Sequence, residues 1–398
     1  MPTRPTEDEL AMLKDVAARR KRFGDQPFKL KERLFDKNFI LENYALENTE
    51  FEACDFMGSE MTGGRLKNVR FIDCLFVANR LDEGEWEDVS FTKCAGRGPV
   101  LIGAPKGKNL AFSDCEFVGA TSEEVKYGGI TEQYGGIGGT DGTVQFSECR
   151  LTRMFINGGS KLAMKTCTVE DVFIQTDKQG GIDMEAVVGK GKVDFGNGNG
   201  VFGDVRIHNS SFAGLVSLDA AEMKTASISD TVGRFRMASA SAESVAMKRV
   251  TFTTGGAPKA DTAYGLHTTS ANIGRMLVEQ CQFEGERAAL HFSGERPRAA
   301  FKPSKPGGRS DPFTSMFGEL TIKGTPVRNA DLKYTKIGTL TIESTTMSDT
   351  DLSNSAFKHL VLRDVTLKGN VDYTATTVGK KTAERVNDTS RGTPPKMS

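Results

Sequence analysis

Apolar residues return at every fifth position in two long stretches of the chain. The first stretch contains Leu41, Leu46, Phe51, Phe56, Met61, Leu66, Phe71, Phe76, Leu81, Trp86 and Phe91. The second contains Ile322, Val327, Leu332, Ile337, Ile342, Met347, Leu352, Phe357, Leu362 and Leu367. An α-helix repeats every 3.6 residues and a strand every two, so neither element alone explains this pattern. A sequence repeat therefore determines the fold.

The residue two positions before each of these apolar residues is usually small or aliphatic, as with Cys54 before Phe56 and Val69 before Phe71. Residues two apart on an extended chain point to the same side. Each five-residue unit would then turn two side chains inward and use the other three to round a corner. Four such units would close one coil of about twenty residues.

Residues twenty positions apart should stack on one another if the coil closes in this way. Several sets have this spacing: Cys54, Cys74 and Cys94; Phe51, Phe71 and Phe91; Leu320, Leu340 and Leu360; and Asp331 and Asp351. The sequence therefore predicts columns of like side chains inside a coiled backbone.

With Ala330-Asp331-Leu332 and Thr350-Asp351-Leu352, the chain resembles the pentapeptide-repeat family, whose motif is a small residue, Asp or Asn, Leu or Phe, a polar residue and Gly. The resemblance implies an all-β fold, a right-handed quadrilateral parallel β-helix. It is strong over residues 41–91 and 322–367 and looser between them. There, many units carry Glu, Arg or Ser where the family has Asp or Asn.

The N-terminal segment, residues 1–36, is expected to be a capping helix and its lead-in. The helix is predicted from about Glu7 to Phe23, because Thr6 and Glu9 form a capping-box signature. A solenoid exposes an unpaired coil at each end, which a helix can cover. Residues 37–373 would form the β-helix, and residues 374–398 a flexible tail.

Four interruptions of the repeat, near residues 122–143, 177–203, 253–270 and 293–317, are predicted to be loops inserted between coils. Insertions in repeat proteins often gather on one side and carry specific contacts. We therefore predict partner-binding residues in the first and last of them. These are Tyr127, Tyr134, Arg296 and Arg298.

The formal charge is balanced, with 52 basic and 52 acidic residues. This balance argues against direct nucleic-acid binding and against attraction to an anionic membrane. Residues 36–94 are locally acidic, with thirteen acids against six bases. Within them lies a cluster that is either a solvated face or a second partner-binding surface: Asp82, Glu83, Glu85, Glu87 and Asp88.

Candidate catalytic and metal-binding motifs are weak. Residues 198–203 match a dinucleotide-binding expression, but a strand-like segment follows where a helix is required. The four histidines have no zinc-site spacing. The seven cysteines occupy the small inward position and are expected to be buried packing thiols, although stacked neighbours such as Cys54 and Cys74 come near disulfide distance. No cofactor and no metal is expected.

The favoured function is a non-enzymatic scaffold or protein-interaction module that binds a protein partner through its loops and end caps. One alternative comes from the resemblance: some family members mimic duplex DNA and inhibit a type II topoisomerase. The other is a β-helix carbohydrate-active enzyme. With no signal peptide and no apolar stretch of membrane-spanning length, the expected compartment is the cytoplasm, in a bacterium or phage. The sequence leaves homo-oligomers and larger assemblies open.

Overall fold

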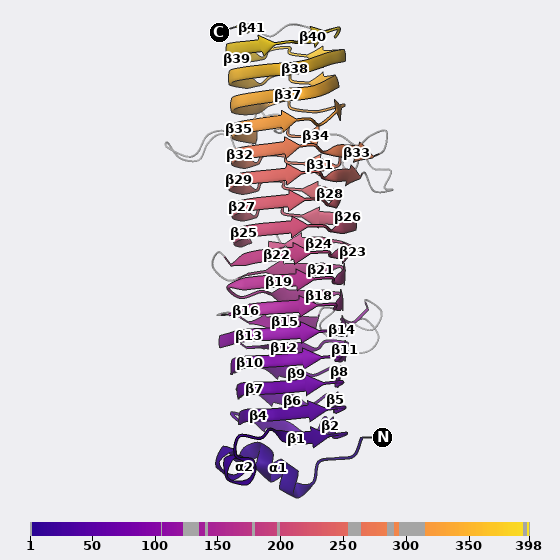
Figure 1. Cartoon of the computed structure of the whole chain (residues 1–398), viewed down its shortest axis with the longest axis vertical. Coiled ribbons are helices and arrows are strands. Elements are labelled where there is room, and N and C mark those ends of the chain that lie inside the picture. The colour runs from indigo at the N-terminus through magenta and orange to yellow at the C-terminus, as the bar shows by residue number, and fades with distance from the viewer. Residues whose placement is uncertain are drawn as a thin grey trace, which may run out of the picture. The chain divides into compact units, whose positions relative to one another are not determined.

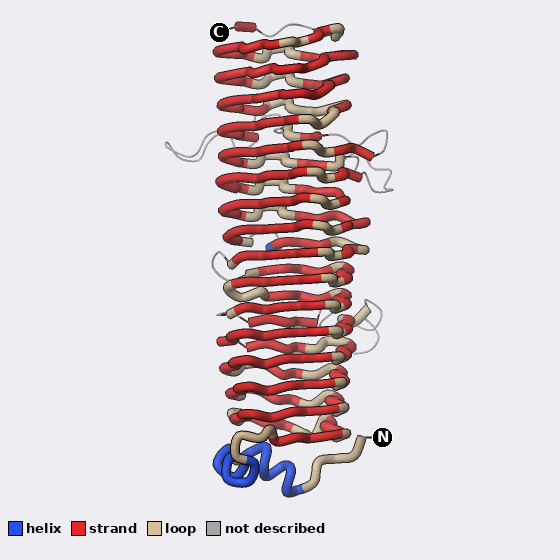
Figure 2. Tube along the Cα trace, viewed as in Figure 1, coloured by secondary structure: helices blue, strands red, loops and turns tan. Residues whose placement is uncertain are grey.

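The structure is a computed structural model that describes residues 2–104, 106–121, 135–139, 142–176, 180–196, 200–253, 264–284, 290–293, 315–392 and 396–397. The chain divides into two compact units, Met1–Asp194 and Phe195–Ser398, here called unit 1 and unit 2. In each unit, parallel strands lie one above another as successive coils of a solenoid (Figure 1). Strands dominate the described residues of both units, and the two α-helices lie at the N-terminal end of unit 1 (Figure 2).

The first coils of unit 1 advance by twenty or twenty-one residues, as the repeat predicts, and a later coil by eighteen. Phe51 pairs with Phe71, and Phe71 pairs in turn with Phe91. The two inward positions of each five-residue side are buried, as at Cys54 and Phe56. This register confirms the predicted four-sided coil for the described residues.

Three stacks of strands form the four walls of unit 1, because the eight-residue strands, such as Ala45–Glu52, turn a corner at a left-handed residue and cover two sides. The first contains β1 (Phe28–Lys31), β4 (Ala45–Glu52), β7 (Arg65–Ile72), β10 (Glu85–Thr92), β13 (Lys106–Ser113), β16 (Thr143–Ser147), β19 (Lys161–Lys165) and β22 (Gly181–Glu185). The second contains β2 (Leu34–Asp36), β5 (Asp55–Met57), β8 (Leu75–Val77), β11 (Ala95–Arg97), β14 (Glu116–Val118), β17 (Arg150–Thr152), β20 (Thr168–Glu170) and β23 (Val188–Gly189). The third contains β3 (Ile40–Glu42), β6 (Glu60–Thr62), β9 (Arg80–Asp82), β12 (Leu101–Ala104), β15 (Gly135–Gly139), β18 (Met154–Asn157), β21 (Val172–Gln175) and β24 (Val193–Phe195).

Corners of the coils, including those within the eight-residue strands, place one residue in the left-handed backbone region. Asn48, Asn68 and Asp88 occupy the same corner in successive coils, with φ of 47°, 52° and 55°. Asn and Asp adopt this region more readily than most residues because their short polar side chains hydrogen-bond locally. The polar residues of the repeat are therefore explained by the turns they make.

Two columns of phenylalanine rings fill the interior of unit 1. Phe71 stacks on Phe51 and on Phe91, with ring centroids 4.9 and 4.7 Å apart. It also meets Phe56 and Phe76 of the second column edge to face, at 5.9 and 5.7 Å. All five rings are almost completely buried. The aromatic repeat of the sequence thus becomes a continuous packed core.

Unit 2 repeats the same parallel register. Its strands are β25 (Val201–His208), β26 (Ser211–Ser217), β27 (Glu222–Ser229), β28 (Val232–Arg236), β29 (Ser241–Lys248), β30 (Thr251–Thr253), β31 (Leu266–His267), β32 (Asn272–Glu279), β33 (Gln282–Glu284), β34 (Leu290–His291), β35 (Ser315–Lys323), β36 (Val327–Arg328), β37 (Thr335–Asp351), β38 (Ala356–Asp372), β39 (Thr377–Glu384), β40 (Asn387–Asp388) and β41 (Lys396–Met397). Leu320 pairs with Leu340, and Leu340 with Leu360, again twenty residues apart.

The N-terminal segment forms two helices where the sequence predicts one. They are α1 (Glu7–Lys14) and α2 (Val16–Phe23). The chain bends at Asp15, whose side chain accepts a hydrogen bond from the amide of Ala18 at 2.9 Å and so caps α2. The predicted capping box of Thr6 and Glu9 is present.

Both helices contact β4 and so cover the first coils of unit 1. Arg19 is buried, and its guanidinium donates to the Leu13 carbonyl at 3.0 Å and to the Ala45 carbonyl of β4. These contacts confirm an N-terminal helical cap.

The predicted loops are shorter than the sequence suggests. The glycine-rich residues 135–139 form β15, which pairs with β12 and β18. Residues 181–185 form β22, which pairs with β19. Glycine and polar residues resemble a loop in sequence, yet backbone pairing within a coil needs no large side chain. Residues 122–134, 177–179, 254–263 and 294–314 lie outside the described residues.

The predicted flexible tail instead continues the solenoid. β39 pairs with β38 from Thr377 to Glu384, and β40 pairs with β38 at Asn387 and Asp388. The side chains of β39 are mostly exposed, which explains why the hydrophobic pattern does not reveal this strand. Pairing of backbone groups alone adds this coil.

Candidate functional site

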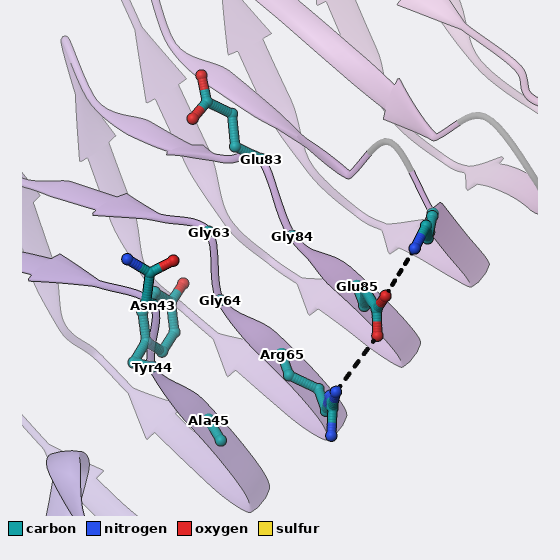
Figure 3. Close-up of a pocket in the computed structure, with 10 residues that line it drawn as sticks. Asn43, Tyr44, Ala45, Gly63, Gly64, Arg65, Glu83, Gly84 and Glu85 are labelled. Atoms are coloured by element: carbon teal, nitrogen blue, oxygen red, sulfur yellow. Dashed lines mark hydrogen bonds and ion pairs between the residues drawn. The ribbon is translucent and has the colours of Figure 1, made fainter.

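An open groove of about 470 Å³ crosses a corner of unit 1. It runs over four successive coils and is lined by Asn43, Tyr44, Ala45, Gly63, Gly64, Arg65, Glu83, Gly84, Glu85 and Lys106 (Figure 3). We call it the corner groove. Two of the five acids predicted for partner binding, Glu83 and Glu85, lie on its wall.

Two glycines make room for the corner groove. A Cβ atom on Gly84 would lie 2.0 Å from the carbonyl oxygen of Gly64, and one on Gly64 would lie 2.2 Å from Cζ of Tyr44. The Tyr44 ring is buried beneath them, and burial raises the pKa of its hydroxyl. The backbone therefore comes close to the neighbouring coil here, and only glycine fits.

The rim of the corner groove carries charges of both signs in successive coils. Oε2 of Glu85 lies 3.6 Å from Nη2 of Arg65, and Oε1 lies 2.9 Å from Nζ of Lys106. Figure 3 shows Arg65 and Glu85 on adjacent coils, with dashed lines for the two ion pairs of Glu85. The hydrogen bond from Lys106, followed by the charges of Lys106 and Arg65, lowers the pKa of Glu85. The side chains of Arg65, Glu85 and Lys106 are each more than half exposed to solvent.

Asp82 and Glu83 share one basic partner. The Arg80 guanidinium donates to both carboxylate oxygens of Asp82 at 2.9 Å and also contacts Glu83. Burial nevertheless raises the pKa of Asp82, because it outweighs the hydrogen bond and charge of Arg80. These two acids therefore present less negative charge than the sequence alone suggests.

The remaining two predicted acids are also occupied. Glu87 lies 3.1 Å from Nζ of Lys67 in the preceding coil. Asp88 accepts a hydrogen bond from the Asn109 amide at 2.8 Å in the next coil. The five acids thus lie close together as predicted, but each has a polar or basic neighbour.

The other predicted partner-binding residues, Tyr127, Tyr134, Arg296 and Arg298, lie outside the described residues. Gly64, Gly84, Arg65 and Lys106 also line the groove and were not predicted from the sequence. The first two are twenty residues apart, and so are Arg65 and Glu85, so the coil spacing could have revealed them.

Unit 2 holds a second polar cluster that the sequence analysis did not identify. The rings of His267 and His291 lie 4.6 Å apart, and Nδ1 of His291 lies 3.6 Å from Oδ2 of Asp331. Each histidine contacts a hydroxyl two residues further on, in Thr269 and Ser293. In later coils this position is occupied by Asp331 and Asp351, each of which accepts a hydrogen bond from the amide two residues further on. The cluster therefore continues a column of turn-forming residues.

Among the described residues, no group of three or more His, Cys, Asp or Glu side chains is placed to hold a metal ion. Within the same residues, no helix is long and apolar enough to cross a membrane.

The coil register and the buried columns define the class of the fold: a parallel β-solenoid, as predicted. No protein-family model and no curated protein matches the chain. Among solved structures, the chain is similar to HetL, a pentapeptide repeat protein involved in heterocyst differentiation regulation from the cyanobacterium Nostoc sp. strain PCC 7120. The two are 9% identical, and the match covers 91% of this chain and 94% of HetL with a TM-score of 0.19. The assignment of the fold rests on the coil geometry of the chain itself.

Proposed function

We propose that the protein is an interaction scaffold that binds a protein partner along the corner groove of unit 1. The main support is the row of side chains Arg65, Glu85 and Lys106, here called the charge ladder, which places charges of alternating sign on three consecutive coils. Hydrogen bonds between coils fix this spacing at about 4.8 Å. A partner segment with complementary charges would find its contacts already in place, which lowers the entropic cost of binding.

The groove is suited to a peptide or protein surface because it is open and contains both polar and apolar walls. Its lining includes the partly exposed backbone of Gly63, which a partner's main chain can approach closely. The residues that line it include no histidine, serine or cysteine to serve as a nucleophile. A binding role fits this composition better than covalent catalysis.

The topoisomerase alternative requires a surface whose negative charge remains uncompensated, like that of duplex DNA. Arg80, Lys67, Arg65 and Lys106 lie beside the acids of this face, so its net charge is smaller than the acid count implies. This pairing weighs against DNA mimicry. A supercoiling assay with DNA gyrase should then show no inhibition at micromolar protein.

A photo-crosslinking residue placed at Glu83 tests the scaffold proposal directly. In lysate of the source organism, we expect one discrete crosslinked partner. Adding Glu85→Lys should reduce its yield at least tenfold, because it reverses the centre of the ladder. The matched control is Glu222→Lys on an exposed position of β27 in unit 2, which should leave the yield unchanged. An equal yield in both variants would contradict binding at the corner groove.

The loops are the other predicted binding elements. Residues 135–139 form β15, so a deletion that tests the first predicted loop should remove only residues 122–134. Loss of the partner in that deletion, with the Glu85→Lys chain still binding, would move the contact from the groove to the loop.

A further inference from the structure

Six of the seven cysteines form one column inside unit 1, with one thiol in each of six consecutive coils. They are Cys54, Cys74, Cys94, Cys115, Cys149 and Cys167, all buried and unoxidised. We call this column the thiol ladder. The amide after each cysteine bonds to the carbonyl of the cysteine below, as in Leu75 to Cys54 at 3.0 Å and Ala95 to Cys74 at 2.9 Å. Only three of the six have the spacing of twenty that sequence reveals.

The backbone holds the thiols in a uniform orientation. Cys74 Sγ donates to the Phe51 carbonyl of the coil below at 3.4 Å, and Cys94 and Cys115 make the same contact with Phe71 and Phe91 at 3.4 Å. Each of these thiols also lies near the carbonyl two residues before it, as Cys149 and Cys167 do at 3.2 and 3.3 Å.

Packing alone does not require sulfur at this position. In unit 2 the equivalent position is filled by Ser210, Thr231, Val250, Cys281, Thr325, Thr345 and Val365. The solenoid therefore accepts hydroxyl and aliphatic side chains of similar size. An unbroken run of six thiols in unit 1 calls for a chemical explanation beyond volume.

The spacing between coils selects one thiol chemistry over another. In-register coils lie about 4.8 Å apart. A disulfide needs an S–S bond of about 2 Å, so two neighbouring sulfurs would have to leave the carbonyls to which they donate and turn toward each other. A soft metal ion between two sulfurs, with metal–sulfur bonds of about 2.3 Å, needs a sulfur separation of about 4.6 Å. The ladder matches the metal without movement of the backbone.

We propose that the thiol ladder binds soft, two-coordinate metal ions, of which Hg²⁺ is the best fit, each ion bridging the thiolates of two consecutive coils. One Hg²⁺ replaces two thiol protons, which leave to solvent, and no electron is transferred. The resulting dithiolate is neutral, so it suits an apolar core in which an unpaired charge would be costly. The monovalent ions Cu⁺ and Ag⁺ would leave one negative charge buried.

The ladder sets the number of ions. A thiolate bridging two ions in a straight line is geometrically strained, so each sulfur serves one ion and the ions occupy alternate gaps. Six thiols then hold at most three ions, in the pairs Cys54–Cys74, Cys94–Cys115 and Cys149–Cys167. Two-thiol sites of this kind are compatible with the absence of any three-residue metal cluster among the described residues.

Titration of the full chain with mercuric chloride, followed by native mass spectrometry and X-ray absorption, tests the proposal. We expect three Hg²⁺ per chain, each with two sulfur neighbours and a mass gain that reflects two lost protons. Cys94→Ser should lower the number from three to two. The triple variant Cys74→Ser, Cys115→Ser, Cys149→Ser should abolish the two-sulfur signal, because it leaves Cys54, Cys94 and Cys167 without an adjacent thiol.

Cys281→Ser is the matched control. Cys281 is buried like the others but lies between Val250 and Thr325 in its column, so the count should stay at three. One ion per thiol with a single sulfur neighbour, three or four sulfurs per ion, or a Cys94→Ser variant that still binds three ions would each overturn the proposal. If the triple variant fails to fold, the single variant and the control still decide the question.

Discussion

The two units build the same coil from different side chains. The inward column that contains Phe51, Phe71 and Phe91 in unit 1 corresponds to one with Ile207, Ile228 and Met247 in unit 2. The neighbouring column holds thiols in unit 1 and a mixture of hydroxyl and aliphatic residues in unit 2. Backbone register is therefore maintained by the corners and by hydrogen bonds between coils. The identity of the inward residues is free to vary, and so can serve a second purpose.

The aromatic column should make unit 1 more sensitive to truncation than unit 2. Replacing Phe71 with Ala removes a ring that contacts four others, and should cost about 3–5 kcal/mol in the free energy of unfolding. Ile228→Ala empties the equivalent position of unit 2 and should cost about 2–4 kcal/mol.

A urea titration separates the two effects. The chain contains a single tryptophan, Trp86, which lies in β10 of unit 1, so its fluorescence reports that unit. Circular dichroism reports both units. Phe71→Ala should shift the fluorescence transition, whereas Ile228→Ala should shift only the circular dichroism. A fluorescence transition that moves equally in both variants would show that the units unfold together and that the comparison between them has no energetic meaning.

The sequence predicts the coil because the physical requirement repeats with the chain. Every inward position must be apolar or small, so Phe51, Phe71 and Phe91 reveal the period. The prediction weakens where backbone pairing replaces side-chain burial. The glycines of β15 and the exposed lysines of β39 give no hydrophobic signal, yet both strands pair with their neighbours. Sequence patterns record side chains, whereas a sheet is held by main-chain hydrogen bonds.

The candidate site was predictable only in part for a related reason. The acids from Asp82 to Asp88 are adjacent in sequence and therefore visible, but their partners Arg65, Lys67 and Lys106 come from the coils before and after. The interruption at residues 122–134 similarly hides the alignment of Cys115 with Cys149. A count of local charge cannot show neutralisation across coils, which depends on the register.

The N-terminal end of unit 1 is covered by α1 and α2, and an ion pair between Glu9 and Arg33 joins this cap to the first coil. Arg33 donates to the Glu9 carboxylate at 2.9–3.1 Å, and Glu9 also accepts from the Thr6 amide at 2.8 Å. Burial raises the pKa of Glu9, but these bonds and the charge of Arg33 outweigh it, so the pKa falls below its ordinary value of 4.5. A lowered pKa adds stability above the unfolded-state value, and this contribution disappears as the pH falls through the folded value.

Glu9→Gln should therefore destabilise unit 1 at pH 7 by about 1–2 kcal/mol through loss of the charged pair and weakening of the cap. The difference from the unmodified chain should shrink steadily below about pH 4.5, where the native carboxylate also becomes protonated. Trp86 fluorescence during urea unfolding at pH 7 and pH 3.5 measures it. A difference that is the same at both values would mean that charge plays no part. Glu222→Gln, at an exposed position of unit 2, serves as the control and should leave the free energy of unfolding unchanged at both pH values.

The smallest effect is expected for the surface ion pairs, which the two units share. Lys67 and Glu87 in unit 1 and Lys323 and Glu343 in unit 2 are each 3.1 Å apart across adjacent coils. Glu87→Gln and Glu343→Gln should each cost at most about 0.5–1 kcal/mol, because exposed pairs gain little over solvation by water. Both costs should vanish at about 1 M salt, where charges are screened within a few ångströms. If Glu87→Gln cost markedly more than Glu343→Gln and remained costly in salt, the Lys67–Glu87 pair would be a structural element of unit 1. Its charges would then not be free for a partner.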